Sequence, residues 1–217
     1  DVYKRQVPIG KDGSQTAPTN PLFSLQLTPS LQKEWVRLPD FPGPARVQPV
    51  LTAQQSEDGI RLYLAGGFQP ASAHQEAIVC TEMLSYHPKT KQWRNEGFLP
   101  SLAGGSHRTV TGGCAIASGD SSILLVGGVN YDRFRDALNY PEPDYLLHPA
   151  DWYKFNTSLL QYNTFTKHWT HLGNYEELAR AGAGIANNAN TVIIIGGELK
   201  PGIRTPEVNA FKLTRHP

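Results

Sequence analysis

The pattern that most constrains the fold recurs three times along the 217 residues: a short apolar run that ends in two glycines. The copies are residues 61–67 (RLYLAGG), 123–128 (ILLVGG) and 192–197 (VIIIGG). Recurrence at such spacings is typical of architectures in which one supersecondary unit, unable to bury its apolar face alone, stacks on its neighbours.

The residues that follow the glycine pairs predict hairpins. Tyr86 is followed seven residues later by Trp93, and Tyr162 is followed seven residues later by Trp169. A polar turn lies between the aromatic residues in each case, so each pair is expected on two antiparallel strands. The turns are residues 88–91 and 164–167.

Segments rich in small residues precede the glycine runs, and small residues suit strands crowded near an axis. They are residues 45–52, 109–116 and 180–185. Each unit then has the order small-residue strand, glycine strand, tyrosine strand, tryptophan strand, which predicts an all-β chain built from the four-stranded blades of a β-propeller of kelch type. The glycine pairs recur after 61 and 69 residues, longer than the roughly 50 of a plain kelch repeat, so the loops should carry insertions.

One domain, residues 1–217, is predicted. Complete blades are expected at about 43–97 and 105–173, partial ones at 22–42 and 179–213, and loop or non-native sequence at 1–20. Propellers usually close with about four to eight blades. We therefore expect roughly half of a longer protein, and a marginal or aggregation-prone chain when it stands alone, because open sheet edges invite pairing.

The longest insertion follows the second glycine pair. Phe134, Ala137 and Leu138 have the spacing of one helical face, which predicts a short helical insertion at about 131–152 with a second short helix at 144–148. Helices inserted in a propeller loop form a lid or a rim.

Charge and composition exclude several partners. Twenty basic and 19 acidic residues give a net charge of +1, which offers no field for nucleic acid or an anionic membrane. No apolar run nears the roughly 18 residues of a membrane span. Seven scattered histidines and two distant cysteines show no metal-ligand spacing, so no metal and no cofactor is predicted.

The loop after the third glycine pair holds the strongest candidates for chemistry. Glu198 and Arg204 lie six residues apart, and Pro201-Gly202 between them predicts a turn that brings both to one space. The alternative is a solvated pair on the rim, which contributes little to stability. Spacing alone favours that alternative, because charged loop residues are usually solvated.

The sequence of this loop, GGELKPGIRT from residue 196, resembles the motif of the kelch-type N-acetylneuraminate epimerases, also called sialic acid mutarotases or cyclically permuted mutarotases. GGVN at 127–130, the insertion and FNTSLLQY at 155–162 are also similar to that family. The resemblance implies a six-bladed propeller, of which about three blades are present here, that interconverts the α and β anomers of N-acetylneuraminate. It further implies that Glu198 is the proton acceptor with Arg204 beside it. A bacterial, periplasmic location is implied too, while a cytoplasmic one stays open.

Three further residues are predicted to bind substrate. Asn130 follows Gly-Gly-Val and would hydrogen-bond a sugar hydroxyl or N-acetyl group, although an Asn after a strand is more often a turn or cap residue. Arg46 and Arg180 lie in the small-residue strands, where a ligand anion would satisfy an otherwise unpaired buried charge.

The competing function is a non-catalytic kelch scaffold that binds other proteins, because fold does not determine function. The direction of Glu198 and Arg204 separates the two hypotheses: side chains that point into the funnel favour a small anionic ligand. The oligomeric state is left open.

Overall fold

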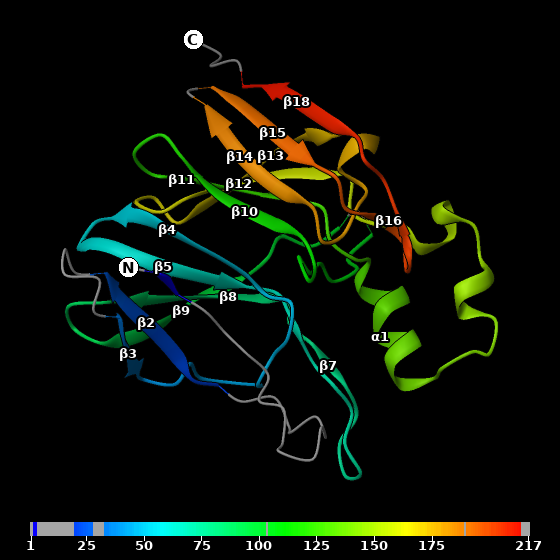
Figure 1. The fold of residues 1–217 in the computed structure, drawn as a ribbon, viewed down its shortest axis with the longest axis horizontal. Helices are drawn as coiled ribbons and strands as arrows, with labels where there is room; N and C mark the ends of the chain where they lie inside the picture. Colours follow the sequence, from blue (N-terminus) through cyan, green and yellow to red (C-terminus); the bar gives the residue numbers. More distant parts are fainter. Residues whose placement is uncertain (1, 4–19, 28–32, 103, 189, 214–217) are drawn as a thin grey trace.

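The computed structural model describes residues 2–3, 20–27, 33–102, 104–188 and 190–213. Its strands form successive antiparallel sheets that fan out one after another (Figure 1). The N-terminal sheet has the order β1-β2-β3, with strands Val2–Tyr3, Leu22–Leu27 and Lys33–Leu38. Residues 2–3, expected in a loop, thus form a short strand paired with β2.

Two four-stranded sheets follow. Sheet 1 has the order β4-β5-β8-β9, with strands Val50–Ser56, Gly59–Ala65, Glu82–His87 and Gln92–Phe98. Sheet 2 has the order β10-β11-β12-β13, with strands Cys114–Ser118, Ser122–Val126, Ser158–Asn163 and His168–Asn174.

Within the described residues, sheet 3 has three strands in the order β14-β15-β18: Gly184–Asn188, Thr191–Ile195 and Val208–Lys212. The short ladders β6-β7 (Phe68–Gln69 and Ile78–Val79) and β16-β17 (Glu198–Lys200 and Ile203–Arg204) lie in the connections. The prediction of an all-β chain with one helical insertion is confirmed.

The tyrosine–tryptophan hairpins are confirmed at the level of individual residues. Tyr86 pairs with Trp93, and Tyr162 pairs with Trp169, as directly opposed residues of their sheets. The ring centroids lie 5.0 and 4.8 Å apart, and both tyrosines are fully buried. Aromatic pairs opposed across two strands stabilise the sheet beyond their burial.

The small-residue segments are not strands along their whole length, contrary to expectation. The inner strands begin at Val50, Cys114 and Gly184, later than predicted. Two residues before each inner strand, Gln48, Gly112 and Gly182 have φ angles of 53°, 70° and 63°. This left-handed conformation turns the chain before it enters the sheet, so Arg46 and Arg180 lie ahead of the strands and not in them.

These three turns are linked to one another. The amide of Gly112 donates to the carbonyl of Gln48 (3.0 Å), and the amide of Gly182 donates to the carbonyl of Gly112 (2.7 Å). The same backbone step thus joins sheet 1 to sheet 2 and sheet 2 to sheet 3. We call these residues the inner turns.

The hydrophobic core lies between successive sheets. One cluster joins sheets 1 and 2 and includes Tyr63, Met83, Leu125 and Tyr162. A second joins sheets 2 and 3 and includes Cys114, Leu124, Val192 and Ile194. A smaller cluster joins the N-terminal sheet to sheet 1, and another packs Phe41, in the connection after β3, against sheet 1. Each sheet is therefore stabilised by its neighbours.

The insertion after the second glycine pair is helical as predicted, but in three short pieces instead of two. These are α1 (Tyr131–Asn139) and the 3₁₀ helices η1 (Tyr145–Leu147) and η2 (Ala150–Tyr153). Another 3₁₀ turn, η3 (Glu176–Leu178), was not predicted. Among the described residues, no helix has the length and apolar character needed to cross a membrane.

Candidate active site

The connections between the second and third strands of the sheets lie on one side of the molecule, where β7, α1 and β16 are visible in Figure 1. The Asn139 side chain donates to the Ala77 carbonyl (3.2 Å) and accepts from the Ala77 amide (2.7 Å), which joins α1 to the first connection. Phe68 and Phe134 pack edge to face with centroids 5.0 Å apart. These contacts join the first connection to the second. We call the three connections together the rim.

Glu198 and Arg204 meet within this rim. They are opposed residues of the β16-β17 ladder, whose turn contains Gly202 with φ 78°. Arg204 Nε lies 3.3 Å from Glu198 Oε1. The predicted turn therefore does bring the two side chains together. The Arg204 side chain is 81% exposed and that of Glu198 is 32% exposed, so their mutual attraction is weak and a ligand can replace it at small cost.

The backbone of Glu198 is anchored close to the inner turns. Its amide donates to the carbonyl of Ala181 (2.7 Å), and the amide of Ala181 donates back to the carbonyl of Glu198 (2.9 Å). Ala181 immediately precedes Gly182 of the inner turns. The carboxylate is therefore carried on the part of the rim that adjoins the innermost segments of the fold.

The same position occurs in each repeat, which allows a comparison within the chain. Phe68, Val129 and Glu198 each follow a glycine pair, and each donates its amide to the residue before an inner turn (3.0, 3.0 and 2.7 Å). Two of the three positions carry apolar side chains. The fold therefore does not require a carboxylate there, and Glu198 is free to serve another purpose.

Arg46 is fully buried but its charge is paired. Its guanidinium contacts the Glu82 carboxylate, donates to the carbonyl of Gly66 (3.1 Å) and lies over the ring of Phe41 (5.5 Å from the centroid). The premise that this buried charge needs a ligand anion is therefore wrong, because the protein supplies the anion. Its role as a substrate ligand stays a prediction.

Arg180 repeats the arrangement in sheet 3. Its Nη2 lies 3.3 Å from Glu207 Oε2 and 3.0 Å from Asn209 Oδ1, although its buried Nε has no partner among the described residues. In sheet 2 the equivalent positions hold Val110 and Ser158, so there the ion pair is absent. The premise of an unpaired charge fails for Arg180 as well.

Asn130 is the N-cap of α1. Its side-chain oxygen accepts a hydrogen bond from the amide of Arg133 (3.0 Å), and its backbone is extended (φ −70°, ψ 132°). N-capping satisfies an amide that the first turn of a helix leaves without a partner. The cap alternative is thus confirmed for the oxygen, and the substrate-binding role stays a prediction.

Lys200 carries a function that the sequence did not indicate. Its ammonium donates to the carbonyls of Leu146 (3.2 Å) and His148 (2.6 Å), at the end of η1. It thereby joins the hairpin of Glu198 and Arg204 to the insertion. The partners lie more than 50 residues away in sequence, so no local pattern predicts the contact.

Arg108 differs from Arg46 and Arg180. It is 7% exposed and its Nε donates to the carbonyl of Pro100 (3.0 Å), but Nη1 is buried without a partner, and no carboxylate of the described residues pairs with it. Desolvation lowers the pKa of this guanidinium. Arg108 directly follows His107, whose ring packs against Tyr131 at the start of α1 (5.2 Å).

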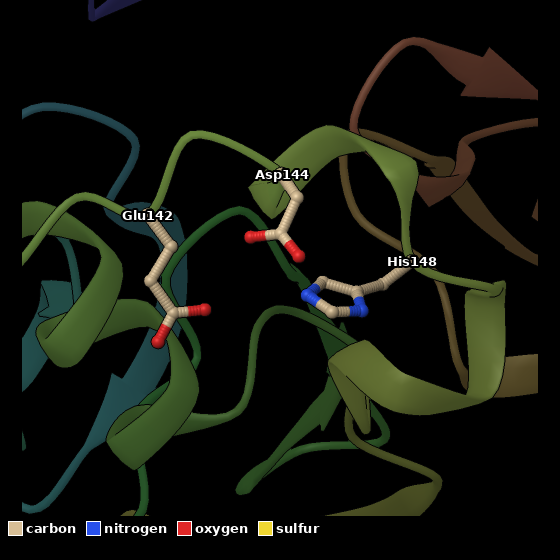
Figure 2. Close-up of side chains that lie close together, drawn as sticks. All are labelled: Glu142, Asp144 and His148. Carbon is tan, nitrogen blue, oxygen red and sulfur yellow. The ribbon is translucent and has the colours of Figure 1, made fainter.

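The described residues include one group that could hold a metal ion, although no metal was predicted. The ligand atoms of Glu142, Asp144 and His148 lie within 4.8 Å of one another. Figure 2 shows the imidazole directed toward the two carboxylates, and its Nε2 is buried without a partner among the residues that the structure describes. An imidazole and two carboxylates suit zinc or manganese. Both carboxylates are exposed, and such acids often lie together without an ion, so the prediction of no metal is untested.

Comparisons with known proteins identify the family of this chain. The chain matches the family model of N-acetylneuraminate epimerase over residues 9–216. The N-acetylneuraminate epimerase of Pasteurella multocida (strain Pm70) is 27% identical over 203 residues, 87% of this chain and 50% of the relative. That of Haemophilus influenzae (strain PittEE) is 30% identical over 192 residues, 83% of this chain and 48% of the relative.

A solved structure, "Structure of YjhT", superposes with a TM-score of 0.72 at 26% identity and covers 90% of this chain and 59% of that chain. The chain spans about half the length of the curated relatives it matches.

Proposed function

The chain belongs to the N-acetylneuraminate epimerase family, and on that premise we propose that it is part of an isomerase that interconverts the α and β anomers of N-acetylneuraminate or a related 2-keto sugar acid. The proposed architecture is a kelch-type propeller of six blades, of which sheets 1 to 3 and the N-terminal sheet are the part described. The substrate would bind where the rim adjoins the inner turns.

The observation that carries the proposal is the carboxylate at position 198. In the two equivalent positions the chain places Phe68 and Val129, so packing does not explain an acid there. Arg204, opposite Glu198, presents an exposed guanidinium to the same space. A base beside a cation suits a substrate that has both a labile hydroxyl proton and a carboxylate.

The mechanism needs only proton transfer and a bond that opens and closes. Glu198 accepts the proton of the anomeric hydroxyl, the bond between the anomeric carbon and the ring oxygen breaks, and that oxygen takes up the proton from Glu198. The open keto form rotates, and the hydroxyl formed from the ring oxygen adds to the other face of the carbonyl. Its proton returns through Glu198 to the anomeric oxygen. Arg204 holds the substrate carboxylate or polarises the ring oxygen, for which the bidentate fork of Arg is better suited than Lys.

Proton NMR of anomer exchange tests the proposal, with the natural full-length protein and freshly released α-sialic acid. Glu198→Gln preserves the shape but removes the base, so the rate should fall by about 10² to 10⁴. Arg204→Lys should raise KM because it keeps the charge and loses the fork. Glu57→Gln, an exposed carboxylate in the turn between β4 and β5, is the matched control and should leave the rate unchanged.

Two results would count against this assignment. If Glu198→Gln exchanges anomers as fast as the parent, Glu198 is not the base. If the parent itself does not exceed the uncatalysed rate, the alternative of a non-catalytic interaction scaffold replaces the enzyme.

A further inference from the structure

Lys200 is the residue through which the hairpin of Glu198 and Arg204 contacts the insertion. Its Nζ donates to the carbonyl oxygens of Leu146 and His148 at 3.2 and 2.6 Å. The last carbonyls of a helix have no partner within the helix, and a lysine near that end satisfies them. The ammonium is therefore engaged by the protein and caps η1.

The segment that receives Lys200 is itself firmly held. The His148 ring stacks on the Trp152 ring, with centroids 3.9 Å apart and 9° between the planes. The guanidinium of Arg133 in α1 lies over the Trp152 ring, 4.4 Å from its centroid. The Tyr153 hydroxyl donates to the carbonyl of Tyr145. The two carbonyls thus form a fixed support and not a passing contact.

The hairpin has few other restraints at its tip. Its base is fixed by the bonds between Glu198 and Ala181 and by the bond from the Thr205 amide to the Gly197 carbonyl (2.9 Å). Beyond that, the ladder is irregular between Glu198 and Lys200 and ends in a two-residue turn. Ile203 and Arg204 are exposed. Among the described residues, the hydrogen bonds of Lys200 are the ones that join this tip to the insertion.

We propose that Lys200 is a positioning residue, which ties the hairpin to the insertion and so fixes the direction of Glu198 and Arg204. Two of its three donors are directed at main-chain oxygens, so we assign it to positioning and not to the substrate carboxylate. Since the insertion also joins the first connection through Asn139 and Ala77, Lys200 completes the rim on the side of sheet 3. The catalytic consequence rests on the proposed function, whereas the tether itself does not.

Hydrogen exchange of the natural full-length protein without substrate tests the tether directly. Lys200→Met should raise amide exchange in residues 196–206 about tenfold, because the hairpin opens locally more often. Lys200→Arg, which can still donate to two carbonyls, should exchange nearly as slowly as the parent. Lys167→Met is the matched control: Lys167 Nζ also donates to a main-chain carbonyl, that of Thr164 (2.6 Å), but in the hairpin of sheet 2.

Anomer exchange kinetics then measure the consequence for catalysis. Lys200→Met should lower kcat about tenfold or more, since a small displacement of a catalytic group is costly, and Lys200→Arg should recover most of it. Unchanged exchange in residues 196–206 of Lys200→Met would overturn the tether, whatever the activity. A rise in KM with unchanged exchange would show instead that Lys200 binds substrate.

A failure of the variant to fold and a failure of the proposed function can both be told apart from a failure of the tether. If Lys200→Met does not fold, judged by circular dichroism, Lys200→Gln replaces it, because Gln retains one donor group and carries no charge. If the parent shows no epimerase activity, the proposed function fails while the exchange result still decides the tether.

Discussion

The hydroxyl of Tyr162 donates a hydrogen bond to Oε2 of Glu96 (3.1 Å) and thereby joins sheet 2 to sheet 1 through a buried carboxylate. The other oxygen of Glu96 accepts from Ser85 and from Arg94 Nε (2.8 Å), and its side chain is only 4% exposed. Burial by itself raises the pKa of Glu96, but the hydrogen bonds from Ser85 and Arg94 outweigh it and hold the pKa below its ordinary value.

The first prediction concerns acid stability. A pKa lower in the folded than in the unfolded chain means that Glu96 stabilises the fold above the unfolded pKa of about 4.3 and loses this effect as pH falls further. Glu96→Gln should therefore lower the free energy of unfolding by about 1–3 kcal/mol at pH 7. Between pH 5 and pH 3, the variant should lose less stability than the parent. Urea unfolding at a series of pH values measures both, and Glu57→Gln is the exposed control.

A parallel loss of stability with pH in the parent and in Glu96→Gln would show that other carboxylates control acid unfolding. Tyr162→Phe provides an independent check, because it removes the donor without altering the charge. It should cost about 1 kcal/mol.

The second prediction concerns Arg46. Because it forms a buried pair with Glu82, Arg46→Met should lower the free energy of unfolding by about 3–5 kcal/mol. The control is Arg37→Met, since Arg37 pairs with Asp40 at the surface and the change should cost less than about 1 kcal/mol. Urea unfolding measures the difference. A stable Arg46→Met variant with a raised KM would instead support the predicted substrate-binding role.

The third prediction explains why the pairs of glycines recur. Gly127 has φ 66°, and a Cβ there would lie 2.6 Å from the carbonyl oxygen of Arg180. Gly119 has a similar φ of 57°, but no atom of the described part of the chain lies within 4 Å of the added Cβ. Gly119→Ala should cost about 1–2 kcal/mol from backbone strain alone, and Gly127→Ala a further ~1–3 kcal/mol from the close approach of the segment that precedes sheet 3. Equal losses in thermal unfolding would contradict this explanation.

The fourth prediction is that chelation leaves the reaction unchanged. In the proposed mechanism a carboxylate and a guanidinium supply the proton transfer and the charge that anomer exchange needs, so EDTA followed by dialysis should not alter the rate. The control is the same dialysis without EDTA. A loss that zinc or manganese restores would refute the prediction and implicate the Glu142, Asp144 and His148 group, for which His148→Ala is the direct test.

The parts of the fold that were predictable are those with a local signal. Tyr86 and Trp93 flank a short polar turn, and such a turn joins two antiparallel strands, so their pairing could be predicted. The late start of the inner strands was not predictable, because Gln48 takes a left-handed conformation without being a glycine. Sequence spacing therefore gave the order of strands but not where the first strand of each unit begins.

The contacts of the candidate site also fall into those with a local sequence signal and those without one. Glu198 and Arg204 share one short loop, so a turn sufficed to predict their contact. The partner of Arg46 lies 36 residues away, and the partners of Lys200 lie 52 and 54 residues away. Such contacts depend on how sheets and insertion pack, which no local pattern contains. The convergence of Glu142, Asp144 and His148 was a missed local signal, because all three lie within seven residues.

The hydrogen bonds of the inner turns all have the same direction. Each later turn donates its amide to the carbonyl of the turn before it, from Gly182 to Gly112 and from Gly112 to Gln48. Such a row can be extended by the same bond, because an inner turn that donates its amide also presents a carbonyl to the amide of the next turn, as Gly112 does. Within the described residues the row takes two steps, and each step adds one sheet to the stack.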